Sequence, residues 1–359
     1  MILPTMNVSG GIENLFLNYL RHIDRKRYAF DFVVHEMNDI SVGKQAEELS
    51  AKVFLMPHFS MKTMGEIRKK YRRILSSENY DIVHSSMANA SFLYLSEAKK
   101  QGIKVRIQHS HQDHAADSLL HALRNIPLLK IGNSYANVNA ACSENAGKFL
   151  FKGKPFFIIN NAIDYGKFSF DEEKRREFRK RYSIGNEFVV GTAGRLCAQK
   201  NQAHLIRDFA KLKEMEKNAL LLIAGEGEKK DELQLLAASL SVSNSVMFLG
   251  PVKDMPSFLS ALDCFVFTSL YEGLPVSGVE AQANGVPCVF SDTITKEADI
   301  SGNVEYLSLD EPASVWAKAI FSKTRETDPL HLSDQFDIRV QAERLMDFYD
   351  RQFSGQTSI

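Results

Sequence analysis

Short apolar runs, each ending in glycine and followed by a helical stretch, recur through the second half of the chain and constrain its fold more than any other feature. Three of them span 189–194, 220–225 and 245–250. Apolar runs of this kind are typical of parallel strands that are buried on both faces. The first half alternates in the same way, with strands expected at 30–34, 53–55, 81–84 and 105–108. This alternation predicts an α/β fold with doubly wound parallel sheets.

Length and composition indicate a cytoplasmic protein of two domains. The chain has 359 residues, of which 44% are hydrophobic, which is enough for two ordinary cores. No apolar run reaches the roughly 18 residues of a spanning helix, and no signal peptide is evident. The four cysteines, Cys142, Cys197, Cys264 and Cys288, lack metal-type spacing and favour a reducing compartment.

The segment from Tyr271 to Glu280 follows an apolar strand at 262–269 and contains the start of a helix. Pro275 suits the first helical turn, where its missing N–H costs nothing. The N–H groups at such a helix start attract anions, because the helix dipole places partial positive charge there. The expected anion site comprises Gly273, Leu274, Pro275, Val276 and Ser277.

Two carboxylates, Glu272 and Glu280, stand eight residues apart around this helix start. One precedes the anion site and the other lies along the helix. That layout suits a ligand with phosphate in the middle and hydroxyl-bearing sugars on both sides, such as a nucleotide-sugar. The alternative is that Glu272 only caps the helix and Glu280 is solvated.

A second strand end places two cations in one loop, Arg195 and Lys200, after the run 189–194. Arginine forks onto phosphate oxygens and lysine adds a compact charge, so the loop could hold a diphosphate without metal. The alternative is two solvated surface residues. Gly225-Glu226-Gly227 is only a weak dinucleotide signal, because Lys230 stands where the third glycine would be. The backbone at Gly250 could meet a base.

Taken together, these motifs resemble glycosyltransferase family 4. The resemblance rests on Glu272-x7-Glu280, on Gly-Arg195-x4-Lys200, on the strand ends at 224–227 and 248–250, on a glycine loop containing Gly10 and Gly11, and on an interdomain segment at 158–164. It implies a GT-B fold, in which two Rossmann-like domains face each other across a cleft. The expected acceptor-side domain is 1–165, the nucleotide-sugar domain is 166–335, and a C-terminal helix within 336–359 packs back on the first domain.

The resemblance also implies a retaining transfer in which the departing phosphate receives the proton of the acceptor. Arg195, Lys200, the helix N–H groups and the loop of Gly10 and Gly11 would stabilise the leaving diphosphate. Glu272 would bind hydroxyls of the donor sugar and Glu280 the ribose. No Asp-x-Asp motif occurs, so neither a metal nor another cofactor is expected.

A histidine at the end of a first-domain strand would face the donor sugar and the acceptor, by the same resemblance. Two candidates occur in Ile-Gln-His-Ser-His, namely His109 and His111, and we prefer His109.

The donor is expected to be a UDP-sugar, because the motifs are especially similar to those of capsule and exopolysaccharide enzymes. It would supply a hexose or N-acetylhexosamine to a lipid-linked or oligosaccharide acceptor. Two alternatives remain open. A 2-epimerase of the same fold would need no acceptor, and a catalytically idle partner subunit would bind donor without turnover.

The neutral net charge conceals an asymmetry between the two halves. Residues 1–165 carry 21 lysines and arginines against 15 aspartates and glutamates, and the rest of the chain carries the opposite excess. One helical stretch has Ile67, Tyr71, Ile74 and Leu75 on one face, flanked by five basic residues: Arg68, Lys69, Lys70, Arg72 and Arg73. This pattern predicts either docking on the inner face of the cell membrane or an ordinary helix with a solvated basic face. Nucleic acid is not an expected partner, since basic and aromatic residues are not interleaved.

Overall fold

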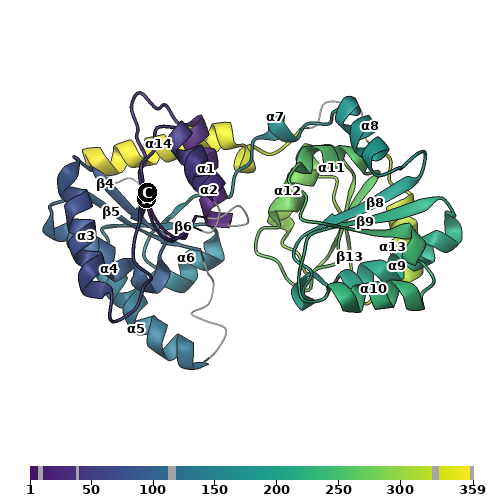
Figure 1. Ribbon diagram of the computed structural model, residues 1–359, viewed down its shortest axis with the longest axis horizontal. Helices are drawn as coiled ribbons and strands as arrows, with labels where there is room; N and C mark the ends of the chain where they lie inside the picture. The colour runs from purple at the N-terminus through teal and green to yellow at the C-terminus, as the bar shows by residue number, and fades with distance from the viewer. Residues whose placement is uncertain (7–10, 38–39, 112–118, 326–330, 356–359) are drawn as a thin grey trace. The chain divides into compact units, whose positions relative to one another are not determined.

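The computed structural model describes residues 1–6, 11–37, 40–111, 119–325 and 331–355. The chain divides into two compact units (Figure 1). Unit 1 contains Met1–Ala162 together with Asp337–Ile359, and unit 2 contains Ile163–Phe336. Each unit has its own parallel sheet, as the alternation of apolar runs and helices predicts.

The sheet of unit 1 has seven strands in the order β3-β2-β1-β4-β5-β6-β7. The order reverses between β1 and β4, and ligands of such sheets bind beyond the carboxyl ends of the strands at this point. The strands are β1 (Ile2–Thr5), β2 (Phe32–Glu36), β3 (Val53–Leu55), β4 (Ile82–Ser85), β5 (Val105–Ser110), β6 (Val138–Ala141) and β7 (Phe157–Ile158). The helices are α1 (Gly11–His22), α2 (Ile40–Glu48), α3 (Met64–Ser77), α4 (Ser91–Lys100), α5 (Leu119–Tyr135), α6 (Glu144–Phe151) and α14 (Ile338–Ser354).

The last helix, α14, belongs to unit 1 although the whole of unit 2 precedes it in the chain. Its apolar residues recur on one face, and Ile338, Ala342, Leu345 and Tyr349 are buried in the same core as β1 and β5. The helix lies against α1 (Figure 1). This one-sided burial is what the spacing of its apolar residues predicts.

The sheet of unit 2 has six strands in the order β10-β9-β8-β11-β12-β13, with its reversal between β8 and β11. The strands are β8 (Phe188–Ala193), β9 (Ala219–Ala224), β10 (Val246–Gly250), β11 (Cys264–Phe267), β12 (Cys288–Ser291) and β13 (Glu305–Leu307). The helices are α7 (Tyr165–Phe168), α8 (Glu172–Arg181), α9 (Gln202–Met215), α10 (Lys230–Ser239), α11 (Met255–Ala261), α12 (Val276–Ala283) and α13 (Ala313–Phe321).

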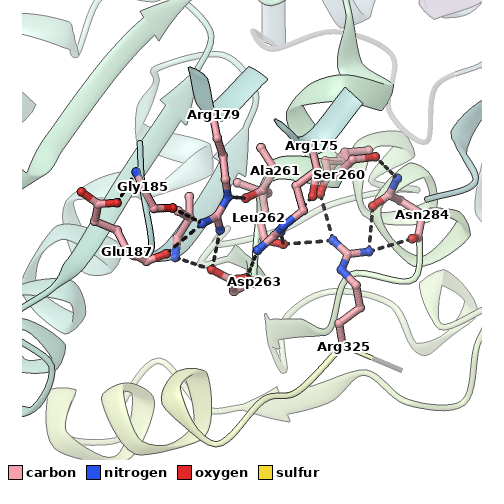
Figure 2. Close-up of polar contacts among 12 residues, drawn as sticks. Arg175, Arg179, Gly185, Glu187, Ser260, Ala261, Leu262, Asp263, Asn284 and Arg325 are labelled. Atoms are coloured by element: carbon pink, nitrogen blue, oxygen red, sulfur yellow. Dashed lines mark hydrogen bonds and ion pairs between the residues drawn. The ribbon is translucent and has the colours of Figure 1, made fainter. Parts of the chain in front are cut away.

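An arginine network closes the end of unit 2 where β8 and β11 begin (Figure 2). Arg175 and Arg179 of α8 each donate to one carboxylate oxygen of Asp263, at 2.7 and 2.8 Å. Arg325 donates to the carbonyl of Leu262 at 3.0 Å, and Asp263 also accepts from the N–H of Val189 at 2.7 Å. These bonds satisfy backbone carbonyls after α11 that would otherwise be buried without partners. The network therefore has a structural role. A ligand would be expected at the opposite, carboxyl end of the strands.

The packing of helix α3 limits how this helix could bind a membrane. Its predicted apolar face is buried within unit 1, so these side chains cannot enter a bilayer. Arg72 donates to the buried Glu97 at 2.8 and 3.1 Å, and Arg68 lies 3.9 Å from the same carboxylate. Lys70 donates to the carbonyl of Leu55. Across the part of the chain that is described, no helix is both long and apolar enough to cross a membrane.

Candidate functional site

The carboxyl ends of β8, β9 and β10 in unit 2 are joined by backbone hydrogen bonds into one continuous edge. Gly194, after β8, donates to Ala224 of β9 at 2.9 Å, and Leu196 donates to Glu226 at 2.8 Å. Gly225 donates to Gly250, the last residue of β10, at 2.8 Å. The loops that carry the predicted motifs therefore lie together, as expected for strand ends near a topological switch point.

The Gly225-x-Gly227 motif allows these loops to approach closely. Gly225 has φ +134°, and a Cβ atom there would lie 1.9 Å from the carbonyl oxygen of Gly194. A Cβ on Gly227 would lie 2.2 Å from the carbonyl oxygen of Leu196. Backbone cannot retreat from such overlaps as a flexible side chain could. Both glycines are thus explained by loop packing.

Lys200 and Glu272, which are 72 residues apart in sequence, form an ion pair at this edge. Lys200 Nζ lies 2.5 Å from Glu272 Oε1, and the same oxygen accepts from Ser269 Oγ at 2.7 Å. The side chains are 19% and 7% exposed, respectively. Sequence reasoning assigned Lys200 to phosphate and Glu272 to sugar as separate groups. In the structure each neutralises the other, so a ligand has to share or divide this pair.

The loops around the pair are held by further contacts between the β8 and β11 ends. Leu270 donates its N–H to the carbonyl of Gln199 at 2.8 Å, and Gln199 Nε2 donates to the carbonyl of Tyr271 at 3.0 Å. Thr268 Oγ1 donates to the carbonyl of Asn201, which starts α9 in a left-handed conformation with φ 49°. These bonds fix the loop that carries Lys200 relative to the loop that carries Glu272.

Arg195 is an exposed cation at this edge. Its guanidinium has no hydrogen bond or ion pair with any described residue, whereas its carbonyl accepts from Gln202 Nε2 at 3.0 Å. The backbone of Arg195 is therefore anchored while its side chain stays available. An arginine in this state suits a phosphate group, since its fork can bind two oxygens at once.

Helix α12 begins beside these residues, as the sequence predicts. Pro275 occupies the N-cap, one position earlier than the first helical turn, and Val276 is the first helical residue. Ser277 Oγ donates to the carbonyl of Ala193 at 3.3 Å, which ties the helix start to the end of β8. The first N–H groups of the helix have no intrahelical acceptor. Free N–H groups of this kind are able to bind an anion.

Glu280 lies one turn further along α12 and is partly buried. Burial raises the pKa of its carboxyl group to about 7, and Lys167 of α7 opposes this shift. No hydrogen bond reaches this carboxylate from the residues that the structure describes. A partly buried acceptor without a donor is suited to the hydroxyls of a ligand such as a ribose.

The other predicted residues belong to unit 1. Gly10 lies outside the described residues, and Gly11 begins α1. His109 is buried in β5, with 1% of its surface exposed, and its ring lies 5.9 Å from that of Phe16. His111, just beyond the strand, is partly exposed and lies 3.1 Å from Ser86 Oγ through Nε2.

The two histidine rings are in contact, with centroids 3.9 Å apart and planes tilted by 36°. Burial lowers the pKa of His109 well below its usual range and that of His111 to about 3. Both rings are therefore neutral at physiological pH. Sequence reasoning did not find His84, which contacts His109, because nothing in the spacing of the two strands marks the contact.

Comparison with known sequences gives consistent results for both halves of the chain. The profile of the family described as Glycosyl transferases group 1 matches residues 173–320. EpsF of Bacillus subtilis strain 168, which is named as a glycosyltransferase, is 30% identical over 329 residues, covering 89% of this chain and 85% of EpsF. An Escherichia coli enzyme named UDP-Gal:alpha-D-GlcNAc-diphosphoundecaprenol alpha-1,3-galactosyltransferase is 24% identical, covering 80% of this chain and 77% of that enzyme.

Solved structures support the fold. A structure of HepE from Anabaena, in complex with UDP and glucose, matches 97% of this chain and 99% of its own with a TM-score of 0.76 and 19% identity. The lipopolysaccharide glycosyltransferase WaaG matches 99% of this chain and 97% of its own with a TM-score of 0.61 and 13% identity. Together with the two parallel sheets, these matches confirm the predicted GT-B fold.

Proposed function

The chain belongs to the group 1 glycosyltransferases, and from this premise we propose that it transfers a hexose or N-acetylhexosamine from a UDP-sugar to a lipid-linked or oligosaccharide acceptor with retention of configuration. The observation that carries the proposal is the group at the carboxyl edge of the unit 2 sheet. There the Lys200–Glu272 pair, the free Arg195 and the start of α12 lie at one edge, with the unpartnered Glu280 further along α12.

This group has separate chemistry for each part of a nucleotide-sugar. Arg195, Lys200 and the N–H groups of α12 would bind the diphosphate, which carries the charge of the leaving group. Glu272 would orient hydroxyls of the sugar, and Glu280 would accept from the ribose. Uridine is proposed because UDP appears in the HepE structure and in the name of the E. coli enzyme.

In the proposed reaction the bond between the anomeric carbon and the diphosphate oxygen breaks, and a bond to the acceptor oxygen forms on the same face of the sugar. The proton of the acceptor hydroxyl passes to the departing phosphate oxygen. The bonding electrons leave with the diphosphate, so charge accumulates where Arg195, Lys200 and the helix start would stabilise it. We propose that these groups make a divalent metal unnecessary.

The acceptor is proposed to be a sugar on a lipid diphosphate in capsule or exopolysaccharide synthesis. Support comes from the E. coli relative, whose name specifies a sugar-diphosphoundecaprenol acceptor. An enzyme of this kind would work at the inner face of the cell membrane. Because the apolar face of α3 is buried, only exposed charges could attract unit 1 to that surface.

The test is a thermal-shift screen of nucleotide-sugars, followed by a transfer assay with the donor that stabilises the protein. Release of nucleoside diphosphate that depends on an acceptor, with a product of unchanged anomeric configuration, is the expected result. Interconversion of sugar nucleotides without acceptor would identify an epimerase instead. Binding of donor without turnover on any acceptor would identify an idle partner subunit and refute the proposal.

A further inference from the structure

Three buried side chains from three elements of unit 1 form a hydrogen-bonded chain that ends at His109. Tyr349 of α14 has its hydroxyl 2.9 Å from Nδ1 of His84 in β4. Nε2 of His84 lies 2.9 Å from Nδ1 of His109 in β5. The last atom of the chain, His109 Nε2, is buried and has no hydrogen-bond partner among the described residues.

The hydrogen bonds between Tyr349, His84 and His109 can be donated in one of two directions. Burial lowers the pKa of both imidazoles and raises that of the Tyr349 phenol, so each ring is neutral and the phenol keeps its proton. In the forward direction Tyr349 donates to His84 Nδ1, and His84 Nε2–H donates to His109 Nδ1. In the reverse direction His109 Nδ1–H donates to His84, and His84 Nδ1–H donates to the phenol oxygen.

Counting unpartnered groups separates the two directions. The forward direction leaves one such group, the Nε2–H of His109. The reverse direction leaves two, because the hydrogen of the Tyr349 hydroxyl has no acceptor and His109 Nε2 has no donor. A buried polar group without a partner costs about 1–3 kcal/mol, so the forward direction is favoured.

We propose that Tyr349 and His84 are positioning residues that hold His109 in the tautomer with Nε2–H, a donor for an oxygen atom of the bound nucleotide-sugar. This deepens the function proposed above and rests on it. His109 is the penultimate residue of β5, near the carboxyl end of the sheet where ligands bind. It follows that His109 donates a hydrogen bond and does not act as a base, which leaves the acceptor proton to the departing phosphate. The C-terminal helix is then part of the active site although it contacts no substrate.

The test uses the full-length protein with ¹⁵N-labelled histidine and the variant Tyr349→Phe. The matched control is Tyr19→Phe, since Tyr19 is equally buried in the same core and donates to the carbonyl of Asn160 at 3.0 Å. Each variant loses one phenol hydrogen bond, but only Tyr349→Phe removes a member of the hydrogen-bonded chain that ends at His109. Nitrogen chemical shifts distinguish a protonated from an unprotonated ring nitrogen.

In wild type and in Tyr19→Phe, His109 should be protonated at Nε2. In Tyr349→Phe both proton directions leave two unpartnered groups, so the Nε2–H population should fall to about half. Because only that tautomer donates to the substrate, kcat should fall about twofold while KM changes less, and Tyr19→Phe should match wild type.

Three outcomes would overturn the proposal. Protonation of His109 at Nδ1 in wild type would show that the chain runs in reverse. An unchanged tautomer in Tyr349→Phe would show that the phenol does not direct it. A changed tautomer with unchanged kcat would show that His109 is not a donor in the reaction. The tautomer measurement needs no substrate. It therefore establishes the proton direction in the hydrogen-bonded chain even if no transferase activity is found and the proposed function fails.

Discussion

Replacing Glu280 with glutamine should make unit 2 more stable at alkaline pH, because the wild-type carboxylate is ionised there at a cost. Burial raises its pKa from 4.5 to about 7, so the folded protein binds this proton more tightly than the unfolded chain does. The stabilising contribution of the bound proton is complete below about pH 4.5 and is lost as the pH rises to about 7. Glutamine has the same shape and no charge to desolvate.

The magnitude follows from the pKa change. One pKa unit corresponds to about 1.4 kcal/mol, so the full effect well above pH 7 is at most about 3.5 kcal/mol. Between pH 5 and pH 8 the loss from this group is about 2.5 kcal/mol. For a domain of this size, 1 kcal/mol shifts Tm by about 2–4 °C, which gives a change of about 5–10 °C.

Differential scanning calorimetry of both proteins at several pH values provides the assay. The quantity of interest is Tm of Glu280→Gln minus Tm of wild type, because the other titrating groups are present in both proteins and cancel. A control replaces Glu228, an exposed carboxylate of the same unit, with glutamine and changes the net charge equally. A Glu280→Gln difference that stays constant from pH 5 to pH 8, or that only matches the control, would refute the argument that burial raises this pKa.

Four further results are expected. Arg195→Ala should weaken binding of UDP about 10- to 100-fold in calorimetric titration, because a charge-assisted bond contributes about 1.5–3 kcal/mol, and unchanged affinity would remove Arg195 from the site. Glu272→Gln should bind UDP at least as tightly as wild type, since it releases Lys200 for phosphate, yet should turn over more slowly; weaker binding with normal kcat would contradict both assignments. Transfer activity should survive excess EDTA, and complete loss that magnesium restores would disprove the metal-free mechanism. The protein should sediment with anionic vesicles at low salt and less after charge reversal at Lys69 and Arg73, whereas a wild type that ignores such vesicles would exclude electrostatic docking.

The fold could be predicted from the sequence because each strand has a recognisable local pattern of apolar residues. The apolar runs that become β8, β9 and β10 are continuous and end in glycine, and a buried parallel strand requires no long-range information to be recognised. Helix α14 could be predicted within one residue of its end, since its apolar residues recur on a single face.

The sequence could not predict what the residues of a recognised pattern contact in the folded protein. The apolar face of α3 was correctly read as one-sided, but the same stripe suits a membrane surface or a protein core, and the choice depends on packing. The same limit applies to Gly225 and Gly227. Their spacing is shared by dinucleotide-binding loops and by any two strand ends that must come within van der Waals contact, and only the distances to Gly194 and Leu196 separate the two explanations.

The contacts that join distant segments were beyond sequence reasoning for a different reason. Lys200 and Glu272 follow different strands, and β8 and β11 become neighbours only because the strand order reverses between them. His84 and His109 likewise meet because β4 and β5 are adjacent, and Tyr349 reaches them from a helix that follows the second unit. In each unit the sequence identified a residue at a strand end, and the topology supplied the partner that sets its charge or its tautomer. The Lys200–Glu272 pair has consequences for charge as well: with Lys200 neutralised by Glu272, Arg195 is an exposed cation at this edge that has no partner among the described residues. A diphosphate would therefore bind Arg195 first, and it would have to compete with Glu272 for Lys200. The sugar hydroxyls could bind Glu272 in place of Lys200. Binding of the phosphate would then depend on correct placement of the sugar.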